Sequence, residues 1–156
     1  MSIVKQIKKT FQVSFGKEWY DTYWAFDIHG TIIRPTYNLN KEQIEFYPYA
    51  KEALQRISDR EDIIMILYTC SYPHEVEKYI EFFEANGIFF QHVNENPGIS
   101  SNMGNFGFYE DKFYFNVLFE DKAGFQAEEE WEEVYNLMKK YEDDNYLPNP
   151  NWTTKY

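Results

Sequence analysis

Residues 27–31, Asp-Ile-His-Gly-Thr, are the part of this chain best suited to chemistry. They follow an apolar, aromatic run at 23–26 that predicts a buried strand, so Asp27 is expected at the carboxyl end of that strand. A carboxylate in this place can attack phosphorus as a nucleophile or bind a divalent cation. Gly30 allows the backbone to turn tightly and to approach a phosphate closely. The hydroxyl of Thr31 can hold the carboxylate in position, so the segment predicts a site for phosphate or a cation.

Polar side chains also border the later predicted strands. Thr69 and Cys70 follow the apolar run 63–68, while Lys112 precedes the run 113–119 and the acidic pair Glu120 and Asp121 follows it. Because ligand sites of open α/β sheets lie at the carboxyl ends of the strands, these groups are expected to converge with Asp27. Phosphoryl transfer through an aspartyl intermediate needs such parts. The carboxylate attacks, Mg²⁺ and a lysine neutralise the phosphoryl oxygens, and a hydroxyl orients the group.

The elements that must position these residues alternate between strand and helix. Apolar runs predict strands over residues 23–28, 63–68, 88–90 and 113–119. Apolar residues at helical spacing predict helices over residues 48–59, 73–86 and 127–142, with Ser71 as the N-cap of the second. The expected core face of the second helix is Val76, Ile80 and Phe83, and that of the third is Trp131, Val134, Leu137 and Met138. The alternation predicts an α/β fold, a three-layer Rossmann-like parallel sheet with helices on both faces.

The rest of the chain is expected to flank one domain. Ile3, Ile7 and Phe11 are four apart, which allows one short amphipathic helix within an N-terminal extension, residues 1–20. The domain itself would occupy residues 21–142. Residues 143–156 are polar and contain two prolines, so a C-terminal surface tail is expected there.

In order and spacing, the four polar motifs resemble those of the haloacid dehalogenase-like (HAD) phosphohydrolases. Residues 27–31 resemble the first motif of that family, Asp-x-Asp-Gly-Thr, and the strand ending in Thr69 resembles the second. Lys112 matches the third motif and Glu120-Asp121 the fourth, with Glu120 in place of the more usual Asp. The resemblance covers roughly residues 22–140. Only short loops stand where HAD enzymes insert caps, so it implies a HAD-like fold with no large cap domain.

The resemblance implies roles for the matching residues. Asp27 would be the nucleophile, Thr69 would contact the phosphoryl group, and Lys112 would bridge the phosphate and the nucleophile. The phosphate would lie among groups from the two loops and the lysine, namely Gly30, Thr69, Cys70 and Lys112. Mg²⁺ would be bound by three carboxylates and one backbone carbonyl, those of Asp27, Glu120, Asp121 and His29 respectively.

His29 stands where the family has a second Asp, which protonates the leaving group and later activates water. Imidazole can give and take a proton near neutral pH, so His29 is a candidate acid/base. Relatives without that Asp tend not to be ordinary phosphatases. The expected function is therefore a Mg²⁺-dependent phosphohydrolase that acts on a phosphomonoester through an aspartyl-phosphate at Asp27. The alternatives are a catalytically impaired binding or regulatory module and a nucleic-acid end phosphatase.

Composition narrows the partners and the compartment. The net charge of −11 over 156 residues counts against nucleic acid, whose phosphates need neutralising Lys and Arg. A phosphorylated substrate is the expected partner. Cys70 is the one cysteine, so no internal disulfide is possible, as is usual in a reducing compartment. The sequence lacks the long apolar run of a signal peptide or a membrane span, so no membrane association and a cytoplasmic location are expected.

Overall fold

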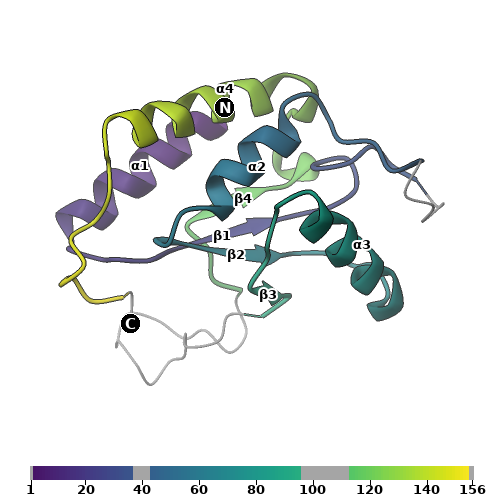
Figure 1. The fold of residues 1–156 in the computed structure, drawn as a ribbon, viewed down its shortest axis with the longest axis horizontal. Coiled ribbons are helices and arrows are strands. Elements are labelled where there is room, and N and C mark those ends of the chain that lie inside the picture. Colours follow the sequence, from purple (N-terminus) through teal and green to yellow (C-terminus); the bar gives the residue numbers. More distant parts are fainter. Residues whose placement is uncertain (1, 37–42, 96–112, 155–156) are drawn as a thin grey trace.

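The computed structural model describes residues 2–36, 43–95 and 113–154, which surround a four-stranded, all-parallel sheet. The strands are β1 (Thr22–Phe26), β2 (Ile63–Leu67), β3 (His92–Val93) and β4 (Val117–Phe119), in the spatial order β3-β2-β1-β4 (Figure 1). The helices are α1 (Ile3–Gly16), α2 (Ala50–Ser58), α3 (Pro73–Ala85) and α4 (Ala127–Asp143), and a short 3₁₀ helix, η2 (Asp121–Ala123), follows β4.

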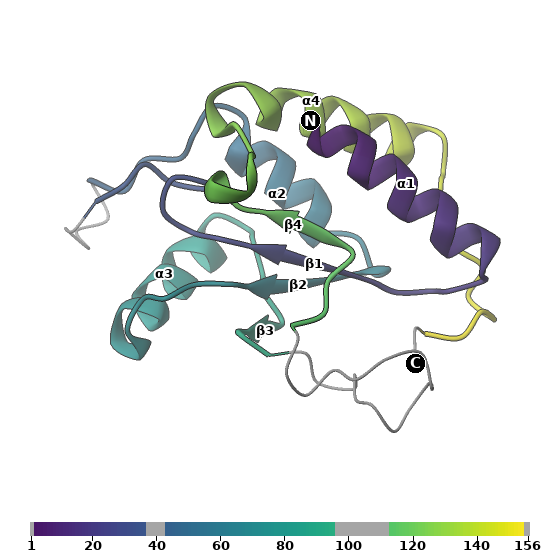
Figure 2. The same cartoon turned by 180° about the vertical axis from the view of Figure 1, so that it is seen from behind.

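The helices and the sheet form the layers that the alternating pattern predicts. α2 and α3 lie in front of the sheet in Figure 1 and behind it in Figure 2, whereas α1 lies behind α4 in the first view and in front of it in the second. α4 packs against both α1 and α2, and α1 also contacts β4. The fold is therefore α/β with a parallel sheet, consistent with a three-layer Rossmann-like architecture. None of the described residues forms a large cap domain.

The register of the sheet brings three strand ends to one edge. Phe26, the last residue of β1, pairs with Leu67 at the end of β2 and with Phe119 at the end of β4. The ladder continues one step further, since the Asp27 N–H donates to the Phe119 carbonyl at 2.9 Å and the Tyr68 N–H donates to the Phe26 carbonyl at 2.8 Å. The residues that follow β1, β2 and β4 are thus held at the same height.

Stacked aromatic rings fix β4 between β1 and α4. Phe26 stacks on Phe119 with ring centroids 4.6 Å apart, and Phe119 stacks on Trp131 at 5.1 Å. All three rings are fully buried. Burial of a side chain of this size contributes about 1.5–3 kcal/mol, so this stack anchors the β4 end on which the acidic pair depends.

Both flanking segments pack on the domain. The predicted amphipathic helix is present as α1, and its Ile3, Ile7 and Phe11 are buried in the main hydrophobic core. After α4 the chain turns back, so that Tyr146 stacks on Phe15 of α1 and the Tyr20 N–H donates to the Thr153 carbonyl. No described helix combines the length and the apolar character that a bilayer span requires.

Three local predictions are wrong. The strand predicted over residues 113–119 is limited to Val117–Phe119. The third strand is His92–Val93, not residues 88–90. Residues 88–90 instead connect α3 to the sheet, and there Ile88 is fully buried while Phe89 is 55% exposed. The N-cap of α3 is Tyr72, not Ser71. The Tyr72 N–H donates to the Glu75 carboxylate at 3.0 Å, and the Ser71 N–H donates to the Thr69 hydroxyl at 3.1 Å.

Candidate active site

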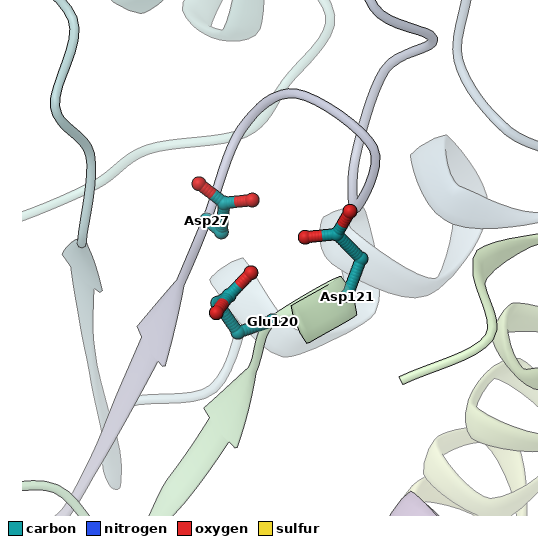
Figure 3. Close-up of side chains that lie close together, drawn as sticks. All are labelled: Asp27, Glu120 and Asp121. Carbon is teal, nitrogen blue, oxygen red and sulfur yellow. The ribbon is translucent and has the colours of Figure 1, made fainter. Parts of the chain in front are cut away.

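Three carboxylates gather at the common edge of β1 and β4. Asp27 directly follows β1, while Glu120 and Asp121 follow β4, and their side chains point toward one centre (Figure 3). One oxygen of each lies within 4.8 Å of the others. Oxygens that share one Mg²⁺ at about 2.1 Å lie no more than about 4.2 Å apart, so a small contraction would let one ion bind all three. The convergence predicted from the strand ends is confirmed for these three residues.

The hydroxyl of Thr31 joins the two acidic segments. It donates to Asp27 Oδ2 at 3.2 Å and accepts from the Asp121 N–H at 3.1 Å. Thr31 is fully buried, and its backbone carbonyl accepts a hydrogen bond of 2.7 Å from the Trp131 indole. Thr31, which was expected to hold Asp27, therefore also fixes the start of η2. The Trp131 indole of α4 holds Thr31 in turn.

Gly30 lets Asp121 approach the first loop. Its φ is +78°, in the left-handed region, and a Cβ built at this position would lie 2.6 Å from Asp121 Oδ2. Any side chain here would therefore meet both backbone strain and the carboxylate. The Gly30 N–H donates to the Ile33 carbonyl at 2.9 Å, which closes the turn after β1.

Burial and neighbouring carboxylates raise the affinity of Asp27 and Glu120 for protons. Burial raises the pKa of Asp27 above its ordinary value, the charge of Asp121 adds to this, and hydrogen bonds from the Ile28 backbone and Thr31 oppose it. The pKa of Glu120 is also raised, chiefly by burial and then by its hydrogen bond with Asp121. A partly buried cluster with this excess of negative charge is a favourable environment for a cation.

The His29 side chain contacts α3. Its Nε2 lies 2.7 Å from the Tyr79 hydroxyl, and the two rings meet edge-on with centroids 5.1 Å apart. The imidazole thus has a fixed partner on the neighbouring helix. The expected contribution of His29 to a metal site concerns its backbone carbonyl, which this side-chain contact leaves unchanged.

The residues after β2 form a separate hydrogen-bonded turn. The Thr69 N–H donates to Asn94 Oδ1 at 2.9 Å, and the Asn94 amide donates to the Thr69 carbonyl at 2.8 Å. The Thr69 hydroxyl accepts from the Ser71 N–H at 3.1 Å. Cys70 is an exposed free thiol. Lys112, the expected phosphate-bridging lysine, lies outside the described residues.

Sequence reasoning did not assign roles to Tyr79 or to the Trp131 indole. Trp131 was expected in the core, and its N–H partner could not be read from spacing. Tyr79 lies three residues after Val76, on the side of the helix that faces the core. A tyrosine at a core position was the available signal, since a buried phenol needs a hydrogen-bond partner.

A cavity at the opposite end of the sheet is a weaker candidate. It has a volume of about 560 Å³ and is bordered by charged residues before β2 and at the end of α2. Its most buried charges neutralise each other, because Arg60 and Asp62 form two hydrogen bonds of 2.9 Å. Among the described residues, the carboxylates that come close enough together to hold a metal ion are Asp27, Glu120 and Asp121, not those at this cavity, so that cluster is the better candidate site.

Comparisons with known proteins support the fold but assign no family and no function. No protein-family model matches the chain, and no curated protein matches it. A solved structure described as that of a conserved protein coded by a locus from Bacteroides thetaiotaomicron is similar, with a TM-score of 0.56 and 22% sequence identity. The match covers 77% of this chain and 91% of the other. At this identity the likeness concerns the arrangement of helices and strands alone.

Proposed function

We propose that this protein is a Mg²⁺-dependent phosphohydrolase of the HAD type, with Asp27 as its nucleophile. The observation that carries the proposal is the cluster of Asp27, Glu120 and Asp121, whose oxygens lie within 4.8 Å of one another at the carboxyl ends of parallel strands. The order of the four sequence motifs supports it. The parallel sheet, on which such sites lie at that edge, is compatible with it.

The donor set fits Mg²⁺. Carboxylate and carbonyl oxygens are the ligands that this hard cation prefers, and Asp27, Glu120, Asp121 and the His29 carbonyl would supply them. When bound, the ion would offset the negative charge of the phosphoryl oxygens and of the carboxylates themselves. A positive charge here would lower the pKa values of Asp27 and Glu120, which burial raises.

The chemistry then divides into two displacements at phosphorus. A carboxylate oxygen of Asp27 attacks the phosphorus, the bond to the leaving oxygen breaks, and an aspartyl-phosphate remains. Water next attacks the same phosphorus, releases inorganic phosphate and restores Asp27. Thr31 holds the nucleophile throughout by its hydrogen bond to Oδ2. The contribution of His29 depends on which of its ring nitrogens carries the hydrogen.

The test is phosphate release from an aryl phosphate, with Mg²⁺ and with EDTA, by the wild type and by Asp27→Asn. We expect metal-dependent release by the wild type and none by Asp27→Asn, because an amide is not a comparable nucleophile. Asp59→Asn, at the exposed end of α2, is the matched control and should keep full activity. Full activity of Asp27→Asn would refute the proposed nucleophile.

A second candidate is a binding or regulatory module with the same site but little turnover. It is favoured by one observation, the hydrogen bond that holds the His29 ring against Tyr79. This candidate predicts a silent wild type that still binds Mg²⁺, and activity gained in His29→Asp. Substantial turnover by the wild type would remove it.

A further inference from the structure

The edge of β4 that faces away from β1 is open to pairing. β4 is the last strand in the order β3-β2-β1-β4, and no other strand of the described chain pairs with it. In a strand, the backbone polar groups of successive residues point to opposite sides. The Phe119 carbonyl accepts from the Asp27 N–H, on the β1 side. The N–H and the carbonyl of Leu118 therefore face away from β1, as a donor and an acceptor for a further strand.

A hollow of about 630 Å³ adjoins this edge. It is lined by Phe115 and Leu118 at the β4 edge and by Lys5 and Lys9 of α1. α1 contacts β4, and Figure 2 shows it beyond β4 on the side away from β1. The volume falls within the range of about 300–1,000 Å³ that is usual for ligand pockets. The open edge therefore borders a space of the size that a ligand needs.

α1 runs along the hollow in the direction opposite to β4. Its first residue, Ile3, donates to the Glu130 carboxylate of α4, which follows β4 in the chain, whereas Gln6 donates to the carbonyl of Asn116, just before β4. Lys5 and Lys9 are one helical turn apart, about 6 Å along the axis. Alternate residues of an extended strand are about 6.6 Å apart. The two lysines thus match the spacing of every second side chain in an added strand.

The charges at this hollow favour an acidic ligand. Lys5 and Lys9 are exposed, and no ion pair among the described residues involves either of them. Glu130 also borders the hollow, but it is buried, and its oxygens accept from the N–H groups of Ile3 and Gln126 at 2.9 and 2.7 Å. In a chain with a net charge of −11, the lysines make this hollow a place where negative charge is attracted.

The edge itself carries no charged side chain. Residues 115–119 are Phe-Asn-Val-Leu-Phe. Edge strands that avoid pairing with other chains commonly carry Lys, another charged residue or Pro. The Phe115 side chain is 38% exposed, and Leu118 is partly exposed. Nothing in the side chains of this edge therefore opposes the approach of another strand.

An added strand would meet different side chains on the two faces of the sheet, because successive side chains point to opposite faces. Phe119 stacks on Trp131 of α4, and α1 packs on α4, so the lysines of α1 lie on the Phe119 face. Leu118 lies on the other face. A strand beside β4 therefore places every second side chain near Lys5 and Lys9, and the remaining side chains near Leu118.

We propose that the β4 edge binds an extended acidic segment of another protein, which joins the sheet as an additional strand. Acidic residues alternate with apolar ones in this segment, so that the acidic side chains face Lys5 and Lys9 and the apolar ones face Leu118. Main-chain hydrogen bonds to Leu118 supply affinity, and the alternating side chains supply specificity. The inference uses neither the carboxylate cluster nor Mg²⁺, so it does not depend on the proposed function.

The first test titrates the protein with a short fluorescent peptide of alternating glutamate and valine. We expect binding that weakens as salt screens the lysines. Lys5→Glu and Lys9→Glu should each weaken it about three- to tenfold, because an attraction becomes a repulsion. Lys8→Glu is the matched control, since Lys8 is exposed on the same helix but does not line the hollow. No binding by the wild type, or equal losses in Lys8→Glu and Lys9→Glu, would overturn the proposal.

The second test separates strand addition from mere attraction of charge. Two versions of the peptide carry backbone N-methyl groups, one on the glutamates and the other on the valines. Only one of these sets of N–H groups can face β4, so one version should lose binding and the other should keep it. In the complex, the Leu118 N–H should also gain protection from hydrogen exchange. Equal affinity of the two versions would show that any polyanion is attracted and would overturn the proposal. Protection of Leu118 that grows with protein concentration without peptide would do so too, because the occupant would then be a second copy of the chain.

Discussion

Asp121 lies so close to Gly30 that a single added methyl group would stand 2.6 Å from its carboxylate oxygen. The loop after β1 and the acidic pair after β4 are therefore in close contact, although about ninety residues separate them in the sequence. Gly30 is needed here for more than a tight turn, since a side chain at this position would meet the Asp121 carboxylate.

Gly30→Ala should abolish Mg²⁺ binding and phosphate release. The alanine would be strained at φ +78° and would displace Asp121, with a stability loss of about 1–3 kcal/mol from the backbone. Isothermal titration with Mg²⁺ and urea unfolding measure the two effects. Gly124→Ala is the control, because it shares a positive φ of +106° but has open space around the added Cβ. Equal loss of Mg²⁺ binding in both variants would contradict the role given to the Gly30–Asp121 contact.

Thr31→Val should weaken both stability and cation binding. The valine has a similar shape but leaves the Asp121 N–H without its partner, at a cost of about 1–3 kcal/mol. It also removes a hydrogen bond that lowers the pKa of Asp27, so that pKa should rise further. Thr31→Ser keeps the hydroxyl and should retain most Mg²⁺ affinity in a titration. A valine variant that binds Mg²⁺ as tightly as the serine variant would contradict the role given to the Thr31 hydroxyl, which joins Asp27 to the Asp121 N–H.

Mg²⁺ binding should strengthen as pH rises through the acidic range. The pKa values of Asp27 and Glu120 are raised, so a larger share of these groups is protonated at mildly acidic pH than in free carboxylates. The ion competes with those protons and should release them on binding. Calorimetry in two buffers of different ionisation enthalpy, at about pH 5 and about pH 8, measures the release. Proton uptake, or tighter binding at the lower pH, would contradict the account.

Asp21→Asn should stabilise the protein at neutral pH. Burial, together with the charge of Asp62, raises the pKa of Asp21 to about 6. The folded state then holds this proton more tightly than the unfolded chain, so wild-type stability falls as pH rises from about 4 to about 6 and stays lower above it. The amide removes that penalty, with a gain on the order of 1 kcal/mol at pH 7 after allowance for solvent screening.

Urea unfolding at about pH 4 and about pH 7 measures the gain, which should vanish at the lower value. Asp59→Asn controls for the change of a carboxylate to an amide. A stabilisation of Asp21→Asn that is equal at both pH values would show that the effect is not one of titration.

The sequence predicts correctly those features that depend on a single helix or strand, or on one general rule of sheet topology. Trp131, Val134, Leu137 and Met138 recur at helical spacing and are buried as predicted. The meeting of Asp27 with the acidic pair follows from the rule that parallel strands end at one edge.

Other features depend on tertiary packing. Residues 88–90 are apolar because Ile88 fills the core after α3, and an apolar run alone does not distinguish such a connection from a strand. On α3 the core position is taken by Tyr79, while the predicted Ile80 is only partly buried. The contact of Tyr79 with His29 joins two elements whose relative placement no periodicity encodes.

The most direct test of the central claim is to look for the covalent intermediate. Wild-type protein would be mixed with Mg²⁺ and an aryl phosphate, quenched in acid within turnover, and digested for mass spectrometry. The account predicts one added phosphoryl group on Asp27, absent with EDTA and absent in Asp27→Asn. Metal-dependent phosphate release with no phosphoryl group on Asp27, or with the group on another residue, would contradict it.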